Sequence, residues 1–110
     1  MIDRELTPIL VNLFQRYPVV TVTGPRQSGK TTLCRAAFPD LAYFNLERPD
    51  VREFASGDPL GFLGQCGDGA VIDEIQRVPE LTSYIQAAVD ESKQNGQFVL
   101  TGSRQLRVTE

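Results

Sequence analysis

GPRQSGKT, at residues 24–31, is the most informative stretch of this 110-residue sequence. It fits the pattern G-x-x-x-x-G-K-[ST] with every fixed position filled. The β-branched run VVTVT at 19–23 precedes it and predicts a strand, and the residues from Lys30 to about Phe38 predict a helix that Pro39 ends. These flanks matter, because a glycine-rich turn without them can be merely a tight connection.

The residue types in this loop suit the binding of phosphate groups. Gly24 and Gly29 permit backbone conformations that other residues avoid, so that successive N–H groups can converge on phosphate oxygens. Lys30 can reach the β- and γ-phosphates, and the N-terminus of the following helix adds the positive end of its dipole. The Thr31 hydroxyl is left facing the Mg²⁺ ion that a nucleoside triphosphate carries. The loop therefore predicts a P-loop nucleotide site.

A second signal is the run AVIDE at residues 70–74, an apolar stretch that ends in two carboxylates. It is typical of a buried parallel strand whose C-terminal end opens into a site. In the functional interpretation Asp73 holds Mg²⁺ through its water shell, and Glu74 takes a proton from the water that attacks the γ-phosphate. In the simpler interpretation both acids lie at a solvated strand end and cap the next turn. The complete loop at 24–31 favours the functional interpretation.

The rest of the chain alternates predicted helices and strands. A helix with Thr7 as N-cap and Pro8 as first residue is expected to end before Pro18, and a short helix at 50–55 is the only one expected within 47–69. A further helix is started by Pro79 and closed by Asn95-Gly96. Strands are expected at 19–23, 41–46, 70–74 and 98–101. This order predicts an α/β fold with a mostly parallel sheet of about four strands and a ligand at their C-terminal ends.

Composition narrows the function further. The length fits one domain, and the net charge of -3 argues against a broad basic face for nucleic acid. No apolar run approaches the ~20 residues of a membrane span, and charged residues 3–5 stand where a signal peptide would be apolar, so a cytoplasmic protein is expected. Because the sequence has no histidine, none is available to complete a set of zinc ligands, and catalysis by Ser-His-Asp or Cys-His groups is excluded. Cys34 and Cys66 are expected to be plain reduced thiols in or near the core.

Three segments in the same order, GPRQSGKTTL, VIDEIQRVPEL and FVLTGSRQ, resemble Walker A, Walker B and sensor 1 of an AAA+ ATPase. More narrowly, they resemble the predicted prokaryotic ATPases that join such a module to a C-terminal domain of unknown function. The resemblance implies a P-loop NTPase-like three-layer α/β/α fold, in which the fourth strand lies between the first and third. It also implies ATP and Mg²⁺ as cofactors.

The same resemblance assigns roles to individual residues. The phosphates of ATP would be bound by Gly24, Pro25, Arg26, Gln27, Ser28, Gly29, Lys30, Thr31 and Thr32. Thr31 and Asp73 would attend Mg²⁺. Glu74 would be the catalytic base, and Ser103 would occupy the sensor 1 position, although Thr-Gly-Ser also fits an ordinary turn after a strand.

The resemblance also exposes a departure, because these ATPases continue past sensor 1 into a fifth strand, a lid region and an extra domain. The sequence stops at Glu110, which predicts a single, truncated N-terminal AAA+ domain over 1–110 and an incomplete core. The first strand would then lie on an open edge of the sheet, unless the helix ending at Tyr17 covers it. Arginines from a neighbouring subunit and from the lid usually assist hydrolysis; Arg77, Arg104 and Arg107 are available, with none assigned.

The expected function is an ATP-binding AAA+ module that hydrolyses ATP with Mg²⁺ if missing C-terminal parts or partner subunits complete it. The alternative is a hydrolysis-deficient nucleotide-binding fragment or a regulatory module that presents a surface to a partner protein or to further copies of the chain. A small-molecule kinase would need a lid and an acceptor-binding region, and a GTPase would need an N-K-x-D segment, which does not occur. The preference for ATP over GTP rests on the resemblance alone.

Overall fold

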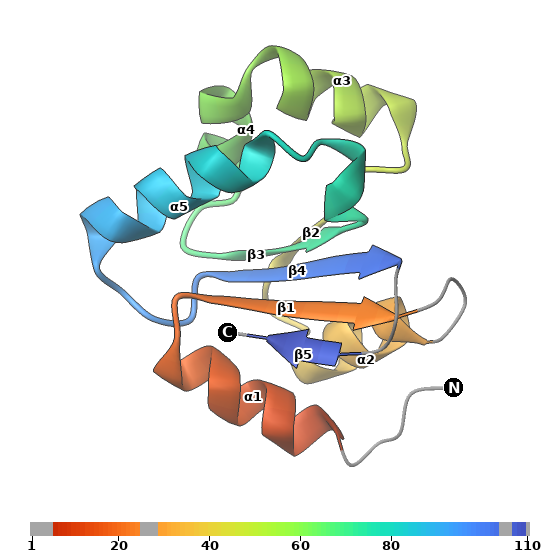
Figure 1. Ribbon diagram of the computed structural model, residues 1–110, viewed down its shortest axis with the longest axis vertical. Helices are drawn as coiled ribbons and strands as arrows, with labels where there is room; N and C mark the ends of the chain where they lie inside the picture. The colour runs from red at the N-terminus through yellow and green to blue at the C-terminus, as the bar shows by residue number, and fades with distance from the viewer. Residues whose placement is uncertain (1–5, 25–28, 104–106, 110) are drawn as a thin grey trace.

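The structure is a computed structural model that describes residues 6–24, 29–103 and 107–109. The strands are β1 (Val19–Gly24), β2 (Ala42–Asn45), β3 (Ala70–Asp73), β4 (Phe98–Ser103) and β5 (Arg107–Thr109). The helices are α1 (Leu6–Arg16), α2 (Lys30–Ala37), α3 (Pro49–Gly57), α4 (Pro59–Gln65) and α5 (Leu81–Ser92), with a 3₁₀ helix η1 (Ile75–Arg77) after β3. Helices cover both faces of one sheet (Figure 1), so the predicted α/β class with three layers is confirmed.

The sheet has the strand order β2-β3-β4-β1-β5. The pairs β2–β3, β3–β4 and β4–β1 are parallel, which confirms both the parallel sheet and the expected position of the fourth strand between the first and third. In Figure 1 the carboxyl ends of these four strands point to the same edge of the sheet. Loops that follow different strands therefore meet at one edge, where ligands of open α/β sheets bind.

The edge of β1 is not open, contrary to the sequence-based expectation. β5 pairs with it antiparallel, with Val22 opposite Val108. The four predicted strands are therefore joined by a fifth. A three-residue strand is too short to show the alternation of apolar and polar residues by which strands are recognised in a sequence. Its pairing satisfies main-chain groups of β1 that could otherwise pair with another chain.

Two apolar clusters hold the helical layers against the sheet. α1 and α2 cover one face, over a cluster that contains Val20, Val22, Val71 and Val99. α3, α4 and α5 cover the other face, over a cluster that contains Ala70, Ile72, Phe98 and Leu100. Successive residues of β3 thus pack against opposite helical layers, which explains why all four of its residues are buried.

Several boundaries differ from the predicted ones. α1 begins at Leu6, so that Thr7 is a helical residue and not the N-cap. The segment 47–69 holds two helices instead of one: Asp58 caps α4 by accepting a hydrogen bond from the Gly61 N–H at 3.0 Å, and Pro59 begins it. Glycines within α4 hid this helix from the sequence pattern, because glycine is a weak helix former.

The end of α5 was also predicted wrongly. The helix stops at Ser92, and Lys93 takes the left-handed conformation at its C-terminus (φ 55°), a role expected of Asn95-Gly96. Glycine favours this conformation, but other residues also adopt it at helix C-termini. Within the described part of the chain, none of the helices combines the length and the apolar character that a membrane span requires.

Candidate functional site

The glycine-rich loop joins the end of β1 to the start of α2. Gly29 is the N-cap residue of α2 and has a left-handed backbone (φ 89°, ψ 11°), which a residue with a side chain would adopt only with strain. Because glycine has no side chain, it offers no cap to the N–H groups of the first helical turn. That turn, which carries Lys30, Thr31 and the exposed Thr32, is therefore suited to an external anion.

Lys30 links the two ends of the loop. Its side chain is 4% exposed, and its ammonium group donates a hydrogen bond to the Gly24 carbonyl oxygen at 3.2 Å. The positive charge is thereby held at the mouth of the loop. The loop positions Pro25, Arg26, Gln27 and Ser28 lie outside the described residues, so their phosphate contacts stay predictions.

The structure brings Asp73, at the end of β3, against the first turn of α2. The Thr31 hydroxyl donates a hydrogen bond to Asp73 Oδ2 at 2.6 Å, although the two residues are 42 positions apart in sequence. Asp73 is only 3% exposed. A buried carboxylate requires hydrogen bonds or a cation to offset its desolvation. The loop and the acid, recognised separately in the sequence, thus form one site.

Two more hydroxyl groups surround the Asp73 carboxylate, and neither was identified from sequence. Tyr43, on β2, donates to Oδ2 at 2.6 Å, and Thr101, on β4, donates a hydrogen bond to Oδ1. Burial, followed by the hydrogen bond to Asp73, raises the pKa of the Tyr43 phenol above its ordinary value, so that it remains a donor. A polar residue inside the buried run FVLT was the available sequence signal for Thr101.

Glu74 lies just beyond the end of β3, whereas the sequence predicted that it belongs to the strand. Its backbone is left-handed (φ 61°, ψ 53°), and its N–H donates to the Thr101 hydroxyl at 3.0 Å. Such a conformation is costly for glutamate and persists where neighbouring contacts impose it. The Gln76 amide donates to Glu74 Oε1 at 2.6 Å, a contact that no sequence pattern indicated. The carboxylate is therefore both turned out of the strand and held by η1.

Ser103 ends β4 and stands opposite Gly24 in the β1–β4 register. Its backbone therefore lies beside the start of the loop, on the strand between β1 and β3. The side chain lies outside what the structure describes, so its sensor 1 role stays a prediction.

The two cysteines are buried free thiols, as predicted. Burial and the Asp73 carboxylate raise the pKa of Cys34 to about 12, against a smaller opposite effect of Lys30. Burial alone raises the pKa of Cys66 to about 12. Both thiols therefore stay protonated and have little nucleophilic character at neutral pH.

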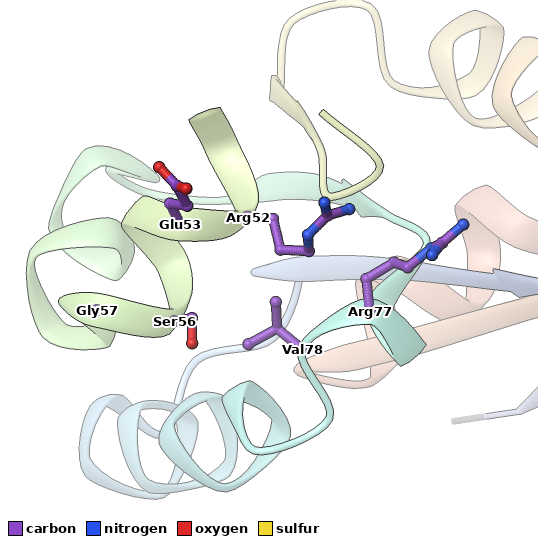
Figure 2. A pocket seen from close by; sticks show the side chains of 6 residues that line it. All are labelled: Arg52, Glu53, Ser56, Gly57, Arg77 and Val78. Atoms are coloured by element: carbon purple, nitrogen blue, oxygen red, sulfur yellow. The ribbon is translucent and has the colours of Figure 1, made fainter. Parts of the chain in front are cut away.

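Beside the acid-bearing turn lies a cavity of about 410 Å³, formed between α3 and η1 and shown in Figure 2. It is lined by Arg52, Glu53, Ser56, Gly57, Arg77 and Val78. Arg52 also donates to the carbonyl oxygens of Leu46 and Glu47, at 3.4 and 3.3 Å. Of the three arginines noted in the sequence, Arg77 lies here. Arg104 and the side chain of Arg107 lie outside the described part.

The donor set around Asp73 fits Mg²⁺. Among the described residues, no group of three or more His, Cys, Asp or Glu side chains could hold a metal ion on its own. Mg²⁺ characteristically takes one or two protein oxygens and completes its shell with water and substrate phosphates. The Thr31 hydroxyl and the Asp73 carboxylate supply such oxygens next to the loop.

Thr101 provides a test of the network itself. Thr101→Val keeps the shape but removes the donor to Asp73 and the acceptor of the Glu74 N–H, leaving both buried groups short of a partner. We expect the free energy of unfolding to fall by about 2 kcal/mol and Tm by about 8 °C, measured by thermal denaturation. The exposed Thr82→Val, which loses only a bond to the Pro79 carbonyl, is the control. Equal shifts in the two variants would contradict the network.

A parallel α/β sheet with a glycine-rich loop between its first strand and the next helix, and an acid across from it, defines the P-loop NTPase-like class. The chain belongs to the AAA domain family, whose model matches residues 16–110. Members of this family are nucleotide-binding, ATPase-like modules, and the resemblance identified in the sequence is thereby confirmed.

Two curated relatives match the chain, each named only as an uncharacterized protein, one from Mycobacterium bovis and one from Mycobacterium tuberculosis. Each is 36% identical over an alignment of 104 residues, and the match covers 91% of this chain and 23% of the relative. The chain thus spans about a quarter of the length of the curated relatives that it matches. No solved structure gives a significant match.

Proposed function

We propose that the chain is an ATP-binding AAA+ module that takes the nucleotide together with Mg²⁺ and, when completed by further parts or subunits, hydrolyses it. The observation that carries the proposal is the 2.6 Å hydrogen bond between Thr31 and Asp73. It joins the phosphate-binding turn to the acid of a distant strand. A structural loop alone would not require this link.

In this proposal the loop and the first turn of α2 bind the phosphates. Lys30 exchanges its hydrogen bond to the Gly24 carbonyl for phosphate oxygens, which neutralise the ammonium better than a carbonyl does. The N–H groups after Gly29 complete the anion site. Thr31 and Asp73 hold Mg²⁺, whose chemistry is to neutralise charge on the β- and γ-phosphates.

Glu74 is the proposed general base. Its carboxylate, just beyond the end of β3, accepts the proton of the attacking water and so raises the nucleophilicity of that water. The Gln76 amide holds Oε1 of this carboxylate in the structure, and it must yield or share this oxygen for the water to bind there. Ser103, beside Gly24 in the sheet, is the proposed contact to the γ-phosphate or to the water.

The second candidate is a module that binds nucleotide and turns it over slowly or not at all. The observation that favours it is the same Gln76–Glu74 hydrogen bond, which engages one oxygen of the proposed base. Binding and turnover separate the two functions. The first candidate includes assembly of the chain with copies of itself or with a partner protein. In such an assembly, a neighbouring subunit supplies an arginine that assists hydrolysis.

The proposed function is tested by titrating a fluorescent ATP analogue into the chain with Mg²⁺ or with EDTA, followed by competition with ATP and GTP. We expect saturable binding of one analogue per chain, tighter with Mg²⁺, and displacement by ATP in preference to GTP. Asp73→Asn should remove most of the Mg²⁺ effect, whereas the exposed Asp68→Asn should leave it unchanged. A chain that ignores the nucleotide under both conditions would contradict the proposal.

A further inference from the structure

Tyr43 reaches the Asp73 site from β2, a strand to which the proposed function assigns no role. In the parallel register Tyr43 stands beside Val71, and residues two apart along a strand share a face. Tyr43 therefore lies on the same face of the sheet as Asp73, the face that α1 and α2 cover. Its hydroxyl donates to Asp73 Oδ2 at 2.6 Å.

The position of this bond on the carboxylate is specific. Oδ2 accepts from Thr31 and from Tyr43, each at 2.6 Å, while Oδ1 accepts from Thr101. Short hydrogen bonds to a charged oxygen are the strong ones, and they are directional. With donors on both oxygens, the carboxylate cannot rotate without breaking at least one of them. Tyr43 is thus part of what fixes the direction in which Asp73 presents its oxygens to Thr31.

The Tyr43 ring is also contacted by α2, the helix that follows the glycine-rich loop. The Arg35 guanidinium lies 4.7 Å from the centre of the ring. Arg35 belongs to α2, the helix that also carries Lys30 and Thr31. A cation over an aromatic face is attracted to it and draws electron density from the ring, which strengthens the phenol as a donor. Tyr43 therefore connects the sheet, the acid and the phosphate-binding helix.

We infer that Tyr43 is a positioning residue of the metal side of this site, which orients Asp73 toward Mg²⁺ without touching the ion. The inference rests on the proposed function. It assigns Tyr43 an effect on metal affinity and none on the phosphate cradle, because its hydroxyl interacts with Asp73 and Thr31, the two residues proposed to hold Mg²⁺. Partners that orient a metal-side ligand in this way are worth about 10- to 100-fold in metal affinity.

The test is Tyr43→Phe, which removes the hydroxyl and retains the ring beneath Arg35. With a fluorescent ATP analogue present, Mg²⁺ is titrated and its midpoint is read from the fluorescence. We expect the midpoint to rise about 10-fold, with the affinity for the analogue in EDTA unchanged. Tyr84→Phe, on the outer side of α5, is the matched control and should leave the midpoint unchanged.

The possible outcomes are distinct. If the unaltered chain binds the analogue but Tyr43→Phe has the midpoint of Tyr84→Phe, the assignment of Tyr43 is wrong and the proposed function stands. If Tyr43→Phe weakens binding equally with Mg²⁺ and with EDTA, the residue has only a structural role, and the inference is again wrong. If the unaltered chain binds no nucleotide, the proposed function fails and the inference with it.

A second measurement needs no substitution of Tyr43. The sequence has three tyrosines, so ring signals of a ¹³C-tyrosine-labelled chain can be assigned with Tyr17→Phe and Tyr84→Phe. Adding Mg²⁺ to the chain with bound ATP analogue should move the Tyr43 signal and leave the other two in place. A Tyr43 signal that does not move on addition of Mg²⁺ would overturn the inference even if Tyr43→Phe did not fold.

Discussion

Lys30→Met is expected to weaken the binding of magnesium nucleotide by about 100-fold while the fold is retained. Methionine keeps the apolar stem of this 4% exposed side chain and removes its ammonium group. The lost group would otherwise contact two phosphates, and charged hydrogen bonds of this kind contribute about 1.5 to 3 kcal/mol each. The measurement is a titration with a fluorescent ATP analogue, accompanied by thermal denaturation.

The matched control is Lys93→Met. Lys93 is the only other lysine in the sequence, and it is exposed at the C-terminal end of α5. Lys93 has the same charge as Lys30 but does not lie at the glycine-rich loop. Lys93→Met should therefore bind nucleotide as the unaltered chain does. If both variants bound equally well, the assignment of the phosphate cradle to the loop would be wrong.

Glu74→Gln is expected to leave nucleotide affinity within about twofold and to lower hydrolysis by at least 100-fold. The amide cannot accept the proton of the attacking water, whereas in the proposed function the phosphates are bound by groups on the loop and on α2. The left-handed backbone at residue 74 does not depend on the charge, so the fold should persist. Phosphate release under single-turnover conditions, measured with Mg²⁺, reports the chemical step.

Glu80→Gln is the control for this variant, since Glu80 is exposed in the turn before α5. Hydrolysis that is unaffected by Glu74→Gln in a sample that turns over would remove Glu74 from the mechanism. Tight binding by the unaltered chain with no phosphate release under any condition would favour the second candidate, a module that holds nucleotide without consuming it.

The parts of the fold and site that sequence predicted are those governed by local chemistry. The loop at 24–31 has a spacing that suits phosphate and indicates the strand and helix on either side of it, and Asp73 ends an apolar run typical of a buried strand. The position of the fourth strand between the first and third came from the family resemblance, and the sheet confirmed it. For the loop and the acid, a short stretch of sequence carried the information.

The parts that sequence missed depend on contacts between distant segments. Tyr43 is one aromatic residue in an apolar run, and only the register of β2 on β3 brings its hydroxyl to Asp73. Gln76 contacts Glu74 because the chain turns sharply after β3, which no residue type there announces. β5 is too short to show alternation, and the glycines of α4 lower its helical propensity.

The hydroxyl groups around Asp73 affect how strongly the proposed site attracts a divalent cation. The three donors found among the described residues are uncharged, so they compensate the loss of water around the carboxylate and leave its full negative charge in place. An arginine or lysine at one of these positions would stabilise the same buried acid equally well, yet it would cancel the electric field that attracts a divalent cation. In the proposed function, neutral donors thus stabilise the buried carboxylate and leave its charge to attract Mg²⁺.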